Sequence, residues 1–409
     1  MKICFITMEF TTEENFHGGL ANYLDKITQS LTKRGHQVHI ITRSSADGVI
    51  EKSGVRIHRV VPRWDQKMRL DHIDPIIPRM YYIPYQDFKA AWCIWRYWLR
   101  LKRLENFDIV QVTNVMSVGL FFRYERTLPV VTRLSSFRPL WDTASGIPIT
   151  PGVRVRWWME RIAIKGTSHV FAPSNYVAHL AEREYGLQKV SVIGSPFSID
   201  GEVSPCERAL EPFFCEPFAL FFGRQTQMKG VDVLGRSVKR IFENYPDFRI
   251  AFVGNDGISP NGGSMMEYIK DLLSEYSDRL YVSPAKKRDE LFEIVANARL
   301  VILPSICDNL PNTCLESMAL GRVVIATQGT CFEELIEDTQ SGFLVEAGSE
   351  KKLEEKIHSV WRFSDDTLKL IGGRAKSAMR RFAPESAVTG HLEFYQRAVA
   401  ASKMRNRAR

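Results

Sequence analysis

The feature that most constrains this chain is a regular alternation of short apolar runs with segments of helical periodicity. Residues 3–7 form an apolar run, and a stripe at Leu20, Leu24 and Ile27 precedes the next run at residues 38–42. Short apolar runs separated by amphipathic helices are typical of strands in parallel sheets that helices cover on both faces. The pattern therefore predicts an α/β fold with doubly wound parallel sheets.

The alternation stops once and then begins again. Residues 198–217 contain three prolines and few apolar pairs, which indicates a linker. A chain of 409 residues is long enough for two cores. We therefore expect an N-terminal Rossmann-like domain at 1–197, a C-terminal Rossmann-like domain at 218–383, and a last helix with a basic tail at 384–409.

Cysteine usage and hydropathy indicate a chain that folds in a reducing compartment. The seven cysteines are odd in number, form no C-x-x-C pair and have no histidine cluster beside them, which argues against a disulfide framework and a zinc site. The opening MKICFITMEF is too short for a signal peptide, and no stretch approaches the roughly 20 apolar residues of a membrane span. We therefore expect a cytoplasmic protein.

The formal net charge of +8 at pH 7 fits an anionic partner. Nucleic acid, anionic lipid and a nucleotide diphosphate all qualify, and charge alone does not choose among them. The sequence contains no nucleic-acid-binding motif, so we expect no nucleic-acid partner.

The loop after the first expected strand ends in His17, Gly18 and Gly19. In open parallel sheets, ligands bind beyond the carboxyl ends of the strands, where loops enter helix N-termini. Paired glycines allow a close backbone approach, and the following helix offers free N–H groups to an anion. The competing interpretation is a plain loop that needs a positive φ. His17 is either a general base or a residue that shapes the loop.

A second loop carries two cations. The expected strand at 218–222 runs into Gly223 and Arg224, and after four more residues come Lys229 and Gly230. A guanidinium and an ammonium that converge on one point suit a pyrophosphate, whose charge grows as a leaving group departs. The alternative is that both cations are solvated loop charges.

A third loop follows the expected strand at 300–303 and leads into a helix that starts near Asn312 and closes at Gly321. Asp308 on the loop can accept hydrogen bonds from sugar hydroxyls, and Glu316 on the helix can accept them from ribose hydroxyls. The helix N-terminus between them can bind phosphate oxygens.

The competing interpretation of this third loop is structural. Asn309 and Asn312 can cap a helix N-terminus, and Glu316 can be a surface charge. Capping alone does not explain why glycines and cations occupy the corresponding places after the other strands.

Five motifs occur in a characteristic order: Gly18-Gly19, Gly35-His36, Gly223-Arg224 with Lys229-Gly230, Asp308 with Glu316, and Gly321-x-Val-Val-Ile-Ala. In this order they resemble the retaining glycosyltransferases of family 4. That family has the GT-B fold, in which two Rossmann-like domains face a cleft and a C-terminal helix crosses back to the N-terminal domain. The similarity covers nearly the whole chain.

The resemblance implies a hexosyltransferase with its donor, a nucleotide diphosphate sugar, on the C-terminal domain and its acceptor on the N-terminal domain. It implies that Asp308, Arg224 and Lys229 are the catalytic residues. The residues implied to bind the donor are Gly18, Gly19, Arg224, Lys229, Asn309, Leu310, Asn312, Thr313 and Glu316.

The chain departs from the family pattern at two places. Asp308 stands where the family's E-x7-E element has its first glutamate, so its contact to the sugar is longer or bridged by water. The family's histidine after the strand at 130–134 is replaced by Ser135. We expect the missing sugar or acceptor contact to come from Arg133, Ser135 or Ser136, with His17 as a further candidate.

The sequence contains no D-x-D pair, the usual clamp for a divalent metal on a nucleotide diphosphate. We therefore expect transfer without a metal or other cofactor, and the resemblance implies retention of the anomeric configuration. Family habits favour UDP-hexose, followed by GDP-mannose, as the donor. A glycan or a lipid-linked molecule would be the acceptor, in polysaccharide biosynthesis.

Two other functions are compatible with the sequence. A nucleotide-sugar 2-epimerase of the same fold needs several acid/base groups around the sugar, and here only Asp308 and His17 are candidates. A catalytically degenerate binding subunit is supported by Asp308 and by the missing histidine, whereas Arg224, Lys229 and Glu316 argue against it.

Residues 88–104 and 153–164 are rich in tryptophan and arginine. This composition suits peripheral contact with an anionic membrane at its inner face, where a lipid-linked acceptor would lie. We favour the alternative, in which Trp92, Trp95 and Leu99 pack on the sheet and the arginines reach outward.

Overall fold

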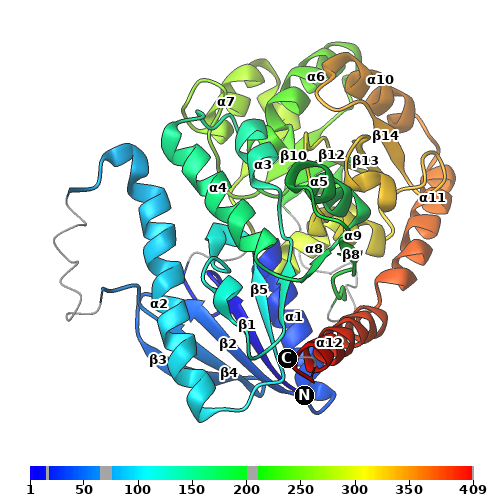
Figure 1. The fold of residues 1–409 in the computed structure, drawn as a ribbon. Coiled ribbons are helices and arrows are strands. Elements are labelled where there is room, and N and C mark those ends of the chain that lie inside the picture. The colour runs from blue at the N-terminus through cyan, green and yellow to red at the C-terminus, as the bar shows by residue number, and fades with distance from the viewer. Residues whose placement is uncertain (15–17, 65–75, 200–210, 408–409) are drawn as a thin grey trace. The chain divides into compact units, whose positions relative to one another are not determined.

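The computed structural model describes residues 1–14, 18–64, 76–199 and 211–407. These residues divide into two compact units (Figure 1). The first unit consists of Met1–Pro139, Pro148–Phe197 and Phe382–Arg409, and the second of Leu140–Ile147 and Ser198–Arg381. Residues 140–147 thus group with the second unit, although we expected one continuous N-terminal segment up to residue 197.

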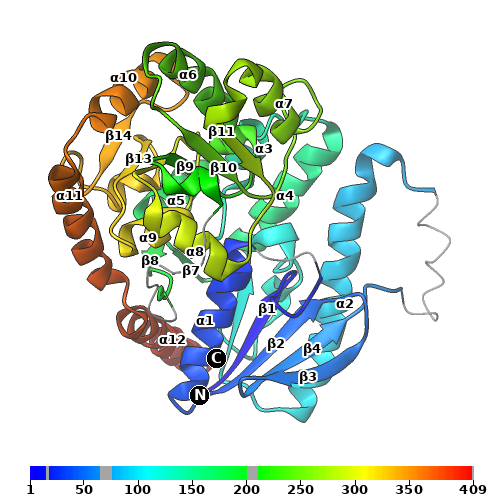
Figure 2. The ribbon, with the colours of Figure 1, turned by 180° about the vertical axis from the view of Figure 1, so that it is seen from behind.

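The first unit contains an eight-stranded sheet with the order β3-β4-β2-β1-β5-β6-β7-β8 (Figure 2). Every neighbouring pair is parallel except β3 and β4, which are antiparallel. The pattern of apolar runs does not predict the edge strand β3, because four of its five residues are exposed and it has no apolar face. The strands are β1 (Lys2–Thr7), β2 (Gln37–Arg43), β3 (Gly48–Lys52), β4 (Val55–Val60), β5 (Ile109–Thr113), β6 (Val130–Arg133), β7 (His169–Ala172) and β8 (Ser191–Val192).

Helices cover both faces of this sheet. Helices α1 (Gly19–Lys33) and α12 (Pro384–Arg407) pack on the face that carries Phe5 and Phe171. Helix α2 (Tyr82–Leu104) packs on the opposite face. The C-terminal helix therefore belongs to the first unit, which confirms the expected crossover, and it extends to Arg407, into the segment expected as a basic tail. The remaining helices before β8 are α3 (Arg138–Ala144), most of which belongs to the second unit, α4 (Pro151–Lys165) and α5 (Asn175–Tyr185).

The tryptophans of α2 form part of the core. Trp98 is fully buried and Trp95 is 8% exposed, and Trp92 and Leu99 pack against the same cluster. The packing interpretation of this helix is therefore confirmed. Within the described residues, no helix is both long enough and apolar enough to cross a bilayer.

The second unit repeats the architecture on a six-stranded sheet with the order β11-β10-β9-β12-β13-β14, in which every pair is parallel. Its strands are β9 (Ala219–Phe222), β10 (Ile250–Val253), β11 (Leu280–Ser283), β12 (Leu300–Leu303), β13 (Val324–Thr327) and β14 (Phe343–Val345). Its helices are α6 (Val231–Asn244), α7 (Met265–Leu272), α8 (Arg288–Asn297), α9 (Asn312–Ala319), α10 (Glu350–Trp361) and α11 (Asp365–Ala378).

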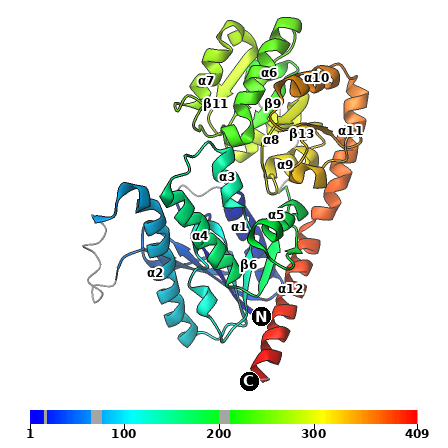
Figure 3. The same cartoon turned by 45° about the horizontal axis from the view of Figure 1, so that its top comes forward.

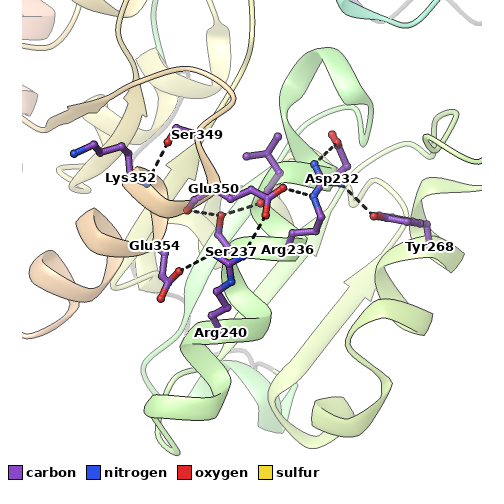
Figure 4. Close-up of polar contacts among 10 residues, drawn as sticks. Asp232, Arg236, Ser237, Arg240, Tyr268, Ser349, Glu350, Lys352 and Glu354 are labelled. Carbon is purple, nitrogen blue, oxygen red and sulfur yellow. Dashed lines mark hydrogen bonds and ion pairs between the residues drawn. The ribbon is translucent and has the colours of Figure 1, made fainter.

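Charged side chains hold α6 against α10 on the surface of the second unit (Figure 4). The Arg236 guanidinium donates to Glu350 Oε1 at 2.5 Å, to Asp232 Oδ2 at 3.0 Å and to the Tyr268 hydroxyl at 3.2 Å. Arg240 donates to Glu354 Oε2 at 3.4 Å. Because one guanidinium joins three partners, this network fixes the helix that follows the two-cation loop.

A buried polar network fixes α1 and α12 in the first unit. His391 Nδ1 lies 2.7 Å from the Ala387 carbonyl oxygen and donates to it, so Nε2 accepts from the Tyr23 hydroxyl at 2.8 Å. Gln111 Nε2 also donates to the Tyr23 oxygen, and Tyr395 donates to Gln111 Oε1. Burial lowers the pKa of His391 to about 4. The imidazole is therefore neutral in the folded chain.

This neutral histidine predicts an acid-dependent loss of stability. The unfolded chain binds a proton at His391 below about pH 6.5, whereas the folded chain binds it only near pH 4. Its contribution to the free energy of unfolding is therefore complete above pH 6.5, and about 2 kcal/mol of it is lost by pH 5. We expect His391→Gln to flatten the pH dependence measured by urea unfolding. The matched change at the exposed His179, His179→Gln, should leave it unaltered, and equal slopes in all three proteins would contradict this account.

Candidate active site

The first element of the candidate site is the end of β9. Gly223 has φ +129°, and Gly254, after the neighbouring strand, has φ +153°. A Cβ at Gly254 would lie 1.7 Å from the Gly223 carbonyl oxygen, so a side chain there is sterically impossible. A Cβ at Gly223 would lie 3.5 Å from Thr313 Cγ2, in the first turn of α9. The Gly223 backbone thus lies directly beside the start of α9.

The two-cation loop is held against the end of β12. Gly230 has φ +69°, and a Cβ there would lie 2.1 Å from the Pro304 carbonyl oxygen. The Ile306 amide also donates to the Met228 carbonyl oxygen at 2.8 Å. A glycine is required at this position both for its backbone conformation and for the close approach. Lys229 is consequently positioned over the loop that carries Asp308.

Lys229 and Asp308 form an ion pair between Nζ and Oδ2. Their side chains are 19% and 7% exposed, so the pair is largely screened from water. The other carboxylate oxygen of Asp308 accepts the Asn309 amide at 3.0 Å. The structure therefore brings together two of the three residues that the resemblance implies to be catalytic.

Arg224 differs from Lys229 in its surroundings. Its side chain is exposed, and its guanidinium makes no hydrogen bond or ion pair with any residue in the described part of the chain. It follows Gly223, which places its backbone next to the first turn of α9. Arg224 is thus a cation with free donors close to a helix N-terminus.

The N-terminus of α9 has open donors. Pro311 is the N-cap residue and makes no side-chain cap hydrogen bond, and Asn312 is the first helical residue, so neither Asn309 nor Asn312 is the N-cap that the alternative interpretation needed. The Cys314 and Leu315 amides both donate to the Pro311 carbonyl oxygen. No acceptor among the described residues lies on the amides of Asn312 and Thr313. These two N–H groups, with the partial positive charge of the helix, suit an anion.

The other residues of this unit that we expect to bind the nucleotide sugar lie around the same helix. Asn309 is 9% exposed and Leu310 is partly buried, both on the loop that precedes α9. Glu316 lies in the second turn of α9 and is also partly buried. Asp308, Arg224 and Glu316 are therefore carried by three chain segments that meet at the α9 N-terminus.

Cysteine thiols near Asp308 are neutral. Burial, with a smaller contribution from the Asp308 charge, raises the pKa of Cys307 to about 12. The same causes raise the pKa of Cys314 and Cys331. Because a thiolate is the reactive form, these three side chains do not supply a nucleophile at neutral pH. The chemistry of the site is left to its carboxylates, cations and backbone amides.

The glycine pair of the first unit starts α1. Gly18 is the N-cap residue with φ −98°, and Gly19 is the first helical residue. Neither glycine has a positive φ, so the plain-loop interpretation is wrong. A Cβ at Gly18 would lie 3.6 Å from Glu9 Oε1, which is ordinary contact. His17 lies outside the described residues.

Arg133 is turned into the first unit. It is 4% exposed, and its guanidinium carbon lies 3.8 Å from the centroid of the Tyr23 ring. Its terminal nitrogens donate to Ser135 Oγ at 2.7 Å and to Ser195 Oγ at 3.1 Å. Arg133 therefore holds Ser135, after β6, and Ser195, after β8, through partly buried hydrogen bonds, which is a different role from the direct sugar contact we considered.

Asn114 and Glu160 hold the same loop, and sequence reasoning missed both. Asn114 Oδ1 accepts the Ser135 amide at 2.6 Å, and Asn114 Nδ2 donates to the Ser136 carbonyl oxygen at 2.7 Å and to Glu160 Oε1 at 3.1 Å. Burial raises the pKa of Glu160 to about 7. No local pattern marks either residue, because their partners are distant in sequence.

Comparisons with known proteins concern the family and the fold of the chain. A family model described as Glycosyltransferase Family 4 matches residues 17–200, and a model described as Glycosyl transferases group 1 matches residues 212–371. The D-inositol 3-phosphate glycosyltransferase of Nocardiopsis dassonvillei is 25% identical over 395 residues, which cover 91% of this chain and 86% of that protein. Several other curated glycosyltransferases align over only 34–48% of their own length.

Solved structures show the same fold. The sucrose-phosphate synthase of Thermosynechococcus elongatus has a TM-score of 0.76 at 17% identity, with 98% of this chain and 99% of that chain covered. HepE of Anabaena in complex with UDP and glucose has a TM-score of 0.67 at 16% identity, with 96% and 98% covered. The two parallel-sheet units, the crossover helix and the two family matches lead to one conclusion. This chain belongs to the group 1 glycosyltransferases and has the GT-B fold.

Proposed function

We propose that this glycosyltransferase moves a hexosyl group from a nucleotide diphosphate sugar to a glycan or lipid-linked acceptor, with retention of the anomeric configuration. The observation that carries the proposal is the Lys229–Asp308 ion pair beside the uncapped N-terminus of α9. An ammonium, a free guanidinium and two open backbone amides within one unit suit the two phosphates of such a donor.

Both members of the ion pair, Lys229 and Asp308, can bind the nucleotide sugar. In the chain without donor, Asp308 holds the Lys229 ammonium in a place that is largely screened from water. When a diphosphate arrives, Lys229 exchanges the carboxylate for phosphate oxygens. The oxygen of Asp308 that is released then accepts hydrogen bonds from sugar hydroxyls, and Glu316 accepts them from the ribose.

The cations then stabilise the departure of the nucleotide. The bond between the anomeric carbon and the β-phosphate oxygen breaks, and negative charge develops on that oxygen beside Lys229, Arg224 and α9. The acceptor oxygen bonds to the same face of the anomeric carbon, and its proton passes to the departing phosphate. Ser135 and Ser136 are the candidate acceptor contacts in the first unit.

UDP-hexose is the proposed donor, with GDP-mannose as the next candidate. Anabaena HepE, which has the same fold, was solved with UDP and glucose bound. We place the reaction in polysaccharide biosynthesis, on the cytoplasmic side. The test is a thermal-shift panel of UDP, GDP, ADP and TDP followed by their sugars, because a ligand bound only by the folded chain raises its stability.

Substitution of Arg224 is the most informative variant for this test, because the Arg224 side chain makes no hydrogen bond or ion pair with another described residue that the substitution would break. A hydrogen bond to a charged group contributes about 1.5–3 kcal/mol, so we expect Arg224→Gln to weaken binding of the preferred nucleoside diphosphate by roughly 10- to 150-fold. The exposed Arg288 on α8 provides the matched control. If Arg288→Gln weakens binding as much as Arg224→Gln does, the loss reflects net charge alone and the assignment fails.

Metal independence is tested separately. Because Lys229, Arg224 and the α9 amides supply the positive charge, we expect the initial rate of nucleotide release in the presence of acceptor to be the same with and without excess EDTA. Loss of turnover in EDTA, restored by added magnesium or manganese, would refute this part of the proposal without affecting the fold or the nucleotide preference.

A further inference from the structure

Three segments of the first unit form an exposed aromatic surface around one apolar pocket. They are the 3-10 turn at Arg79–Tyr81 with the start of α2, the 3-10 turn at Phe122–Tyr124, and α4. Figure 3 shows α2 and α4 side by side. Tyr124 and Trp158 are 60% and 61% exposed although both side chains are large and apolar in character.

The pocket among these segments has a volume of about 450 Å³. Its lining includes Tyr81, Phe88, Tyr124, Trp158 and Ile162, and one cation, Arg123. Pockets of this size are usual for bound organic molecules, and a contiguous exposed apolar patch marks an interaction site more often than chance exposure. We refer to the pocket and its rim as the aromatic–arginine surface.

Close contacts join the segments that carry this surface. A Cβ at Gly152, at the start of α4, would lie 1.8 Å from the Met80 carbonyl oxygen, so the two backbones are in direct contact. Arg156 Nε on α4 donates to Asp87 Oδ2 on α2 at 2.7 Å, and both side chains are largely buried. The pocket therefore does not depend on a partner to form.

The exposed charges on these segments are all positive. Residues 76–104, 115–127 and 148–166 contain three acidic residues, Asp87, Glu125 and Glu160, and each is at most 9% exposed. Trp158 is followed by Arg161 and preceded by Arg154, which lie on the same face of α4 at helical spacing, and both arginines are exposed. Neither arginine, nor Arg123, forms an ion pair with any described residue.

From this combination we infer that the aromatic–arginine surface docks on the surface of an anionic lipid bilayer. Tyrosine and tryptophan are favoured at the boundary between headgroups and hydrocarbon, where a polar edge and an apolar body are both satisfied. Arg123, Arg154 and Arg161 face lipid phosphates, and the pocket takes a hydrocarbon chain. This inference does not depend on the proposed donor chemistry, because none of its residues lies in the donor-binding unit.

The test is flotation of the full chain with vesicles of phosphatidylcholine, with or without about one third phosphatidylglycerol, at about 0.1 M salt. We expect binding to the anionic vesicles alone. Each arginine near the surface contributes about fivefold to the partition coefficient, so Arg123→Gln with Arg154→Gln should lower it about 25-fold. Trp158→Ala should lower it about tenfold through lost apolar burial.

Controls separate membrane docking from its alternatives. Lys369→Gln with Leu370→Ala changes an exposed cation and an exposed apolar residue on α11, in the other unit, and should leave flotation unchanged. All variants should keep the wild-type melting temperature and nucleotide-induced thermal shift. Absence of wild-type flotation, or an equal loss in the α11 control, would overturn the inference. Light scattering that shows a dimer which Trp158→Ala converts to a monomer, without vesicle binding, would assign the surface to a second copy instead.

Discussion

The account depends on one lysine, Lys229, which forms an ion pair largely screened from water beside the α9 N-terminus, where the N-cap residue Pro311 makes no side-chain hydrogen bond. Lys229 can occupy that place because Gly230 lets its loop touch the Pro304 carbonyl and because Asp308 neutralises the ammonium. A buried ion pair is costly to desolvate and is weak as a stabilising device. Under the proposed function, the pair keeps the Lys229 ammonium in place for the donor, because a diphosphate carries more negative charge than one carboxylate and can displace Asp308 from Lys229.

The supporting structure is built to keep that geometry fixed. In the second unit, Arg236 joins α6, the helix that follows the lysine loop, to Glu350 on α10. In the first unit, Tyr23, His391 and Gln111 join α1, α12 and β5 through buried hydrogen bonds. The network of the first unit satisfies its polar groups away from water, which makes it costly to break and specific in its arrangement.

Much of this could be predicted from the sequence, and the reason is physical. Apolar runs that alternate with helical stripes specify parallel sheets, and ordered glycine, cation and carboxylate motifs mark the loops at the strand ends. What escaped prediction depends on contacts between distant residues. We considered Arg133 as a ligand contact, but its guanidinium is buried and stacks on the Tyr23 ring. Asn114 and Glu160 gave no local signal, and β3 carries no apolar face to identify it. The alternative in which Asn312 caps the helix is wrong because Pro311 occupies the N-cap position.

The central claim is that Lys229 and the α9 N-terminus bind the diphosphate. It is tested most directly by calorimetric titration of UDP and UMP into the wild-type chain and into a charge-balanced variant with Lys229→Gln and Asp308→Asn. In the wild type, the second phosphate should improve affinity by at least about tenfold, the effect of one charge-assisted hydrogen bond. In the variant, most of that gain should disappear while UMP affinity is little changed. Equal affinities of wild type for UMP and UDP, or a UDP advantage that survives in the variant, would contradict the account.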